Sequence, residues 1–312
     1  MPIGAFAFIF ALRYIKAGEK IRNRLDIPGT TSLGLALILI SYGAVNITSN
    51  GLDLFNEIFL IAGAVVIAAF VFIETRVAKP LLPMRIFKSR ILTFSIFAAF
   101  FQSLGFLAVV FIIIMYLQGI RGLSPFYSSL LLLPGYVVGS ILGPQFGKLT
   151  DRIGSRIPAT AGLIIMGISI LIYSTMSVSS SLYIVLVGSF FTGIGSSMFY
   201  PANNSAVMAN SPKDLYGLSS GFLRTMANIG MLGSFVMAIS IASISVPRYV
   251  AYEVFAGVET HLGNFSAKFM IGIHSSLYIS LSIIVIAVIL SLARGKEIRK
   301  SQPKPETDAK EA

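Results

Sequence analysis

Long apolar segments recur along almost the whole chain, and short polar segments separate them. Eight segments have about the 20 residues that an α-helix needs to cross a bilayer. We predict one membrane-spanning helix in each, and the last six make up a terminal bundle. The stretch 2–15 is apolar but too short to cross alone, which predicts a partial helix. The eight predicted spans are 31–47, 57–74, 91–117, 127–146, 157–176, 182–200, 218–245 and 268–292. The predicted fold class is an all-α polytopic membrane protein.

The polar segments between the spans divide the chain into predicted parts. Two of them are basic linkers, and the final segment is a short charged tail that contains proline and is typical of a disordered end. The predicted parts are 1–29 (the end of a transmembrane helix and a basic linker), 30–75 (two extra transmembrane helices), 76–90 (a second basic linker), 91–293 (the six-helix bundle) and 294–312 (the tail).

Composition agrees with a bilayer as the solvent for this chain. Of the 312 residues, 55% are hydrophobic and 12% are charged, whereas globular domains carry about 25% charged residues. Cysteine is absent, which excludes disulfides, thiolate catalysis and cysteine-based metal sites. The sequence also has no metal-spaced histidine cluster and no paired carboxylates. We therefore predict no metal, no cofactor and no enzyme activity.

The net charge of +11 raises the question of nucleic-acid binding, but the placement of the charges favours another explanation. If the connections alternate between the two sides of the membrane, most of the 24 Lys and Arg residues fall on one side. This asymmetry is the positive-inside rule, which places the basic side in the cytoplasm. We predict a multi-pass protein of the plasma membrane with a cytoplasmic C-terminus, surrounded by lipid and without a nucleic-acid partner.

A polar segment, GKLTDRIGSR, lies between two of the predicted spans. It is predicted to form a tight cytoplasmic turn, in which Gly154 supplies a positive φ. Asp151 is predicted to lie against a helix N-terminus, where partial positive charge favours a carboxylate. Composition alone is equally consistent with an ordinary positive-inside loop. The fixed positions of the pattern G-x-L-x-D-R-x-G-x-R are Gly147, Leu149, Asp151, Arg152, Gly154 and Arg156.

This pattern resembles the cytoplasmic loop signature of the major facilitator superfamily, which follows the second helix of each six-helix half. Four further stretches resemble its fourteen-helix drug–proton antiporter branch, in the family's order. They are MPIG, RLDIPGTTSLGLALILISYG, KPLLPMRIFKSR and YLQGIRGLSPFYSSLLLLPG. The resemblance implies a proton-coupled exporter of small amphipathic or drug-like compounds that works by alternating access, and it identifies 91–293 as the C-terminal bundle of the major facilitator fold.

By the same resemblance the chain begins within helix six, so we expect it to lack most of an N-terminal half. Asp and Glu are absent from the interior of every predicted span, and Glu57 and Glu74 only mark the two ends of one span. A proton relay usually needs an ionisable group inside the membrane. Substrate and protons are therefore expected as partners only when another half completes the protein. The exposed face of a lone bundle would favour self-association. The alternatives are a non-transporting fragment, one half of a split transporter and, remotely, a polytopic membrane enzyme.

Several uncharged or basic residues within or beside the spans are candidates for specific roles. Cavity lining or gating is one interpretation of the polar side chains, and ordinary interhelical hydrogen bonding or a packing kink is the other. These candidates are Gln102, Pro134, Asn203, Asn204 and Arg224. A second group consists of glycines whose spacing suits close helix contact: Gly139, Gly143, Gly217, Gly221 and Gly230.

Overall fold

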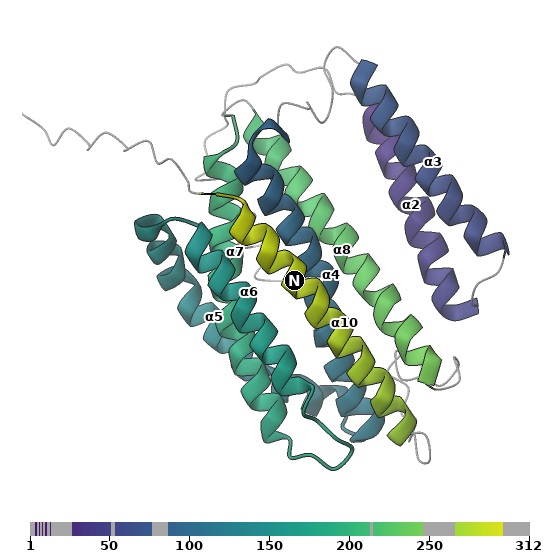
Figure 1. Cartoon of the computed structure of the whole chain (residues 1–312), viewed down its shortest axis with the longest axis vertical. Coiled ribbons are helices and arrows are strands. Elements are labelled where there is room, and N and C mark those ends of the chain that lie inside the picture. The colour runs from purple at the N-terminus through teal and green to yellow at the C-terminus, as the bar shows by residue number, and fades with distance from the viewer. Residues whose placement is uncertain are drawn as a thin grey trace, which may run out of the picture.

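The computed structural model describes residues 4, 6, 8, 10 and 13, and then 27–50, 54–76, 87–212, 215–245 and 266–295. Helices dominate these residues, and no strand occurs among them (Figure 1). The helices are α2 (Ile27–Asn50), α3 (Leu54–Arg76), α4 (Arg90–Met115) with its π-helical continuation η2 (Tyr116–Ile120), α5 (Pro125–Ile153), α6 (Arg156–Tyr173), α7 (Tyr183–Ala209), α8 (Tyr216–Ser245) and α10 (Ser266–Ala293).

The predicted all-α fold is confirmed. Each predicted span coincides with one of these helices, and the described residues near the N-terminus are also helical. Five described segments are long and apolar enough to cross a membrane: Arg90–Ile120, Pro125–Ile153, Arg156–Tyr173, Tyr183–Ala209 and Ala267–Ala293. Most of both predicted basic linkers and all of the tail beyond Gly295 lie outside the described residues.

The six helices α4 to α10 form one bundle, and α2 and α3 form a pair beside α8 (Figure 1). Within the bundle α7 packs between α5 and α6, while α4 packs between α8 and α10. The main core lies where α4, α6 and α10 meet, with Ile113, Leu163 and Leu277 fully buried. The outward faces carry exposed Ile, Leu and Phe side chains, as lipid contact requires.

Local sequence signals set the two ends of α5, the helix that contains most of the segment GKLTDRIGSR (147–156, the pattern segment). The Ser124 side chain caps α5 by accepting a hydrogen bond from the Tyr127 N–H, and Pro125 opens the helix, a position that suits proline. At the other end, Gly154 has φ +91°, which confirms the predicted positive φ. Helix α5 continues to Ile153, so most of the predicted polar loop is helical and the turn itself consists of Gly154 and Ser155.

Candidate functional site

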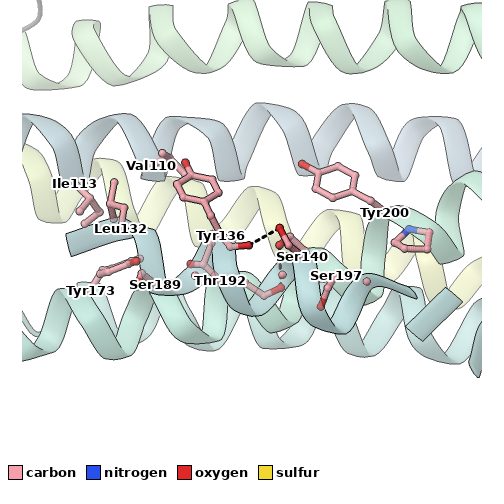
Figure 2. Close-up of a pocket in the computed structure, with 16 residues that line it drawn as sticks. Val110, Ile113, Leu132, Tyr136, Ser140, Tyr173, Ser189, Thr192, Ser197 and Tyr200 are labelled. Atoms are coloured by element: carbon pink, nitrogen blue, oxygen red, sulfur yellow. Dashed lines mark hydrogen bonds between the residues drawn. The ribbon is translucent and has the colours of Figure 1, made fainter. Parts of the chain in front are cut away.

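A cavity of about 360 Å³ opens on the side of the bundle formed by α4, α5 and α7. Three tyrosine rings, Tyr136, Tyr173 and Tyr200, lie around it (Figure 2). The remaining side chains that line it are aliphatic or carry hydroxyl groups, and none is charged: Val110, Ile113, Leu132, Ser140, Ser189, Thr192, Ser196, Ser197 and Pro201, together with Gly135, Gly139, Gly143 and Gly193.

Close contact between α5 and α7 shapes the wall of this cavity. A Cβ atom at Gly193 would overlap the Gly135 carbonyl oxygen, and one at Gly135 would overlap the Ser189 carbonyl oxygen. Gly139 is also close, with its Cβ position 3.4 Å from the Gly193 carbonyl oxygen. Backbones approach this closely only through small residues. The two helices therefore form one wall, and the hydroxyls and rings beside these glycines project into the cavity.

Two of the tyrosine rings are held in place by neighbouring helices. Gly188 makes room for the Tyr173 ring, which a Cβ atom there would overlap. The Tyr200 hydroxyl accepts a hydrogen bond of 3.2 Å from Gln102 Nε2. Gln102 is fully buried on α4, so its amide anchors the Tyr200 ring to that helix. Tyr136 remains 63% exposed, and its carbonyl oxygen accepts a hydrogen bond from Ser140 Oγ at 2.9 Å (Figure 2).

The other predicted polar candidates occupy different places. Asn204 and Arg224 both line a second cavity, of about 390 Å³, between α7 and α8. The structure thus brings these two residues together. Asn203 points away from it into the protein, where Nδ2 donates to the Ser95 carbonyl oxygen at 3.1 Å. Pro134 lies inside α5 and lines neither cavity. The gating role of these residues stays a prediction.

The predicted packing glycines also divide into two groups. Gly139 meets α7, and Gly230 meets α4, where its Cβ position is 2.5 Å from the Phe100 carbonyl oxygen. For Gly143, Gly217 and Gly221, an added Cβ atom meets no described atom within 4 Å. Their predicted packing role therefore has no partner within the described chain, because these three glycines face the open cavities.

The pattern segment lies at the end of the bundle where α5 turns into α6. Gly147, Leu149, Asp151 and Arg152 belong to the last turns of α5. The Asp151 side chain is exposed, and its predicted contact with a helix N-terminus is not made by any described residue. Arg156 donates from Nη2 to the Leu292 carbonyl oxygen at 2.7 Å, which ties the start of α6 to the end of α10.

Arg294 has a structural role that the sequence reasoning missed. Its side chain is only 1% exposed, although the sequence places it at the first position of the predicted tail. Its guanidinium donates to Ser95 Oγ at 3.2 Å, to the Ser155 carbonyl oxygen at 3.1 Å and to Ser291 Oγ at 3.0 Å. One buried cation thus joins α4, the turn after α5 and α10. The one feature of the sequence that could have indicated this role is the position of Arg294 immediately after an apolar span.

Comparison with known proteins agrees with this architecture. Residues 3–235 match the family model described as Major Facilitator Superfamily. The tetracenomycin C resistance and export protein of Streptomyces glaucescens is 25% identical over 247 residues, which are 78% of this chain and 46% of that protein. The multidrug resistance protein Stp of Mycobacterium tuberculosis (strain H37Rv) is 27% identical over 290 residues, 84% of this chain and 53% of that protein.

The lincomycin resistance protein LmrB of Listeria innocua is 25% identical over 298 residues, 94% of this chain and 62% of that protein. The chain thus spans about half the length of the curated relatives it matches. The family match extends from the first described helical residues through α2 to α7 and into α8. Taken with the membrane-spanning helices and the cavity, it establishes that this chain belongs to the Major Facilitator Superfamily.

Proposed function

We propose that this chain forms part of a proton-coupled exporter of amphipathic, drug-like compounds, and that the cavity between α4, α5 and α7 binds the exported compound. The proposal assigns the chain to the fourteen-helix branch, with α4 to α10 as the C-terminal bundle and α2 and α3 as the extra helices. The turn at Gly154 and the end of α10 face the cytoplasm in this proposal. Relatives whose names describe export or resistance support it.

The observation that carries the proposal is the chemistry of the cavity. Tyrosine faces bind aromatic rings and cations, and hydroxyl groups adapt as donors or acceptors. No charged side chain lines the cavity, so nothing in it demands one fixed ionic partner. A pocket of this kind fits a range of flat, amphipathic molecules and is compatible with the lincomycin, tetracenomycin and multidrug names of the relatives.

The geometry also suits alternating access, in which rigid bundles rock about a site between them. Gly135 and Gly193 lock α5 to α7, so this wall of the cavity moves as one piece. Asp151 is exposed at the end of α5 and is proposed to contact a helix N-terminus of a second bundle. That bundle is proposed to come from the rest of a longer protein, from a split partner or from a second copy.

Proton coupling belongs to the same proposal. In the five candidate spans Asp151 is the one carboxylate, and it lies at a helix end. We therefore propose that the proton-carrying group lies outside these spans. The competing hypothesis is a bundle that folds without binding any exported compound. An enzyme is the remote alternative. It would need a catalytic constellation, and the described residues contain no cluster of His, Asp or Glu that could hold a metal.

Binding of ethidium, a flat aromatic cation, tests the proposal on the purified protein in lipid nanodiscs. We expect saturable binding by fluorescence anisotropy. Tyr136→Leu should weaken it roughly fivefold, because a ring–cation contact contributes about 1 kcal/mol. Tyr183→Leu is the matched control, since Tyr183 is exposed and lines no described cavity. The absence of saturable binding would favour the non-binding bundle. Equal affinities of the two variants would place the binding site outside this cavity and would contradict the proposal.

A further inference from the structure

A groove of about 610 Å³, different from both cavities described above, lies at the end of the bundle where α5 turns into α6. It is separate from the tyrosine-lined cavity, because the two share no lining residue, and it is formed by the end of α5, the turn after it, the first turns of α6 and the end of α10. Its polar end contains Arg152 and Arg156, and its apolar walls are formed by Ile157, Ala161, Ile164 and Leu292. Thr160 also lines it, and its hydroxyl is hydrogen-bonded to Ser291 Oγ at 2.7 Å.

The apolar walls of this groove face the surroundings of the bundle. Ile157 is 62% exposed, Ile164 48% and Leu292 47%. Because α6 is a candidate membrane span, hydrocarbon is the environment that suits such exposed aliphatic side chains. The groove therefore runs from a polar end at the helix terminus into the apolar zone of the membrane. This change in polarity along its length matches that of an amphiphile, which has a polar head and an apolar tail.

The charge at the polar end is positive. Arg152 and Arg156 are the charged residues that line the groove, and Asp151 does not line it. Arg156 donates one N–H from Nη2 to the Leu292 carbonyl oxygen. A guanidinium has five N–H donors, so this bond uses one of five. Arg294 adds a third cation directly behind the groove, where its Nη2 donates to the Ser155 carbonyl oxygen.

The start of α6 adds to this positive character. The helix begins at Arg156, directly after the turn residue Ser155. The first amide N–H groups of a helix have no partner within the helix, and they carry partial positive charge. An oxyanion placed between these amides and two guanidinium groups would meet donors from both, since arginine suits the geometry of phosphate oxygens.

We propose that this groove binds one anionic phospholipid from the surrounding bilayer, of the phosphatidylglycerol type. The phosphate contacts Arg152, Arg156 and the start of α6. One acyl chain lies along Ile157, Ala161, Ile164 and Leu292. A soluble phosphate would use only the polar end and would leave these walls empty, so the membrane lipid fits the whole groove. The proposal requires only that the bundle is embedded in a membrane, and it is independent of any transport activity.

Competition binding in detergent micelles tests this proposal on the complete chain. The probe is a fluorescent phosphatidylglycerol, and the competitors are unlabelled phosphatidylglycerol, phosphatidylcholine and glycerol phosphate. We expect phosphatidylglycerol to displace the probe and the other two to displace little. Displacement by glycerol phosphate at similar concentrations would instead show a soluble-anion site. Displacement by phosphatidylcholine at similar concentrations would show unspecific lipid contact. Either result overturns the proposal.

Variants separate the polar end from the apolar walls. Arg152→Gln with Arg156→Gln should weaken probe binding about tenfold, the effect of losing charge-assisted phosphate contacts. Lys148→Gln is the matched control, because Lys148 is exposed on the same helix and does not line the groove. Equal losses in the control would mean diffuse electrostatic attraction and would contradict a defined site.

Ala161→Phe fills the groove without changing any charge, and it should weaken binding of the probe by a similar factor. Unchanged binding in this variant would mean that no acyl chain lies in the groove, and it would overturn the proposal. Circular dichroism of each variant reports whether it folds. Arg152→Gln alone, at an exposed position of α5, keeps the test decisive if the Arg156 substitution unfolds the protein. The single variant should still bind the probe more weakly than Lys148→Gln does.

Discussion

Arg294→Ala is expected to destabilise the bundle by at least about 3 kcal/mol, because it removes a buried guanidinium whose charge-assisted hydrogen bonds join three parts of the bundle. The guanidinium joins Ser95 of α4, the Ser155 and Arg156 carbonyl oxygens, and Ser291 of α10. A buried acceptor that loses its partner costs more than an exposed one, since water does not replace the lost bond.

Thermal unfolding in detergent, followed by circular dichroism, measures this effect. The matched control is Arg152→Ala, which removes the same side chain from an exposed position in α5. Arg294→Lys should fall between the two, because an ammonium keeps the charge but does not reproduce the planar set of donors. If Arg294→Ala and Arg152→Ala unfold at the same temperature, Arg294 does not join the helices as described.

Gly193→Ala is expected to have the second largest effect, on both stability and the shape of the cavity. The added methyl group would overlap the Gly135 carbonyl oxygen, so α5 and α7 must separate. Overpacking of this kind costs about 1–3 kcal/mol. Ethidium binding should fall as well, because the two helices carry most of the cavity lining.

Gly143→Ala is the control for this substitution. It makes the same chemical change on α5 and also lies at the cavity, but its new methyl group meets no described atom within 4 Å. The unfolding temperature of the Gly143 variant should stay close to that of the original protein. Equal destabilisation by both substitutions would mean that the contact between α5 and α7 does not depend on glycine.

The sequence predicted the spans and the turn well because single strong effects determine them. Bilayer thickness sets the length of an apolar helix, and the residue at a positive φ is usually glycine, as Gly154 shows. The helical end of α5 was not predicted, since charged residues such as Lys148 and Arg152 tell where the hydrocarbon ends and not where the helix ends.

The details of the site depend on which helix faces meet, and one sequence does not contain that information. Spacing singled out Gly143 and Gly139 equally, yet only Gly139 has an added Cβ within 4 Å of α7. Gly135 and Gly193, which make the tightest contact between these helices, were not singled out. Arg294 was assigned to the tail, because hydropathy locates a backbone and not the direction in which a long side chain turns.

The central claim is that the tyrosine-lined cavity binds the exported compound. Protection of a single cysteine tests it most directly, since the chain contains no other cysteine. Ser140→Cys places a thiol in the cavity, and Ser179→Cys places one at an exposed position between α6 and α7. With the protein in nanodiscs, saturating ethidium should slow maleimide labelling at position 140 and leave position 179 unchanged. Labelling at position 140 that is equally fast with and without ethidium would contradict the account.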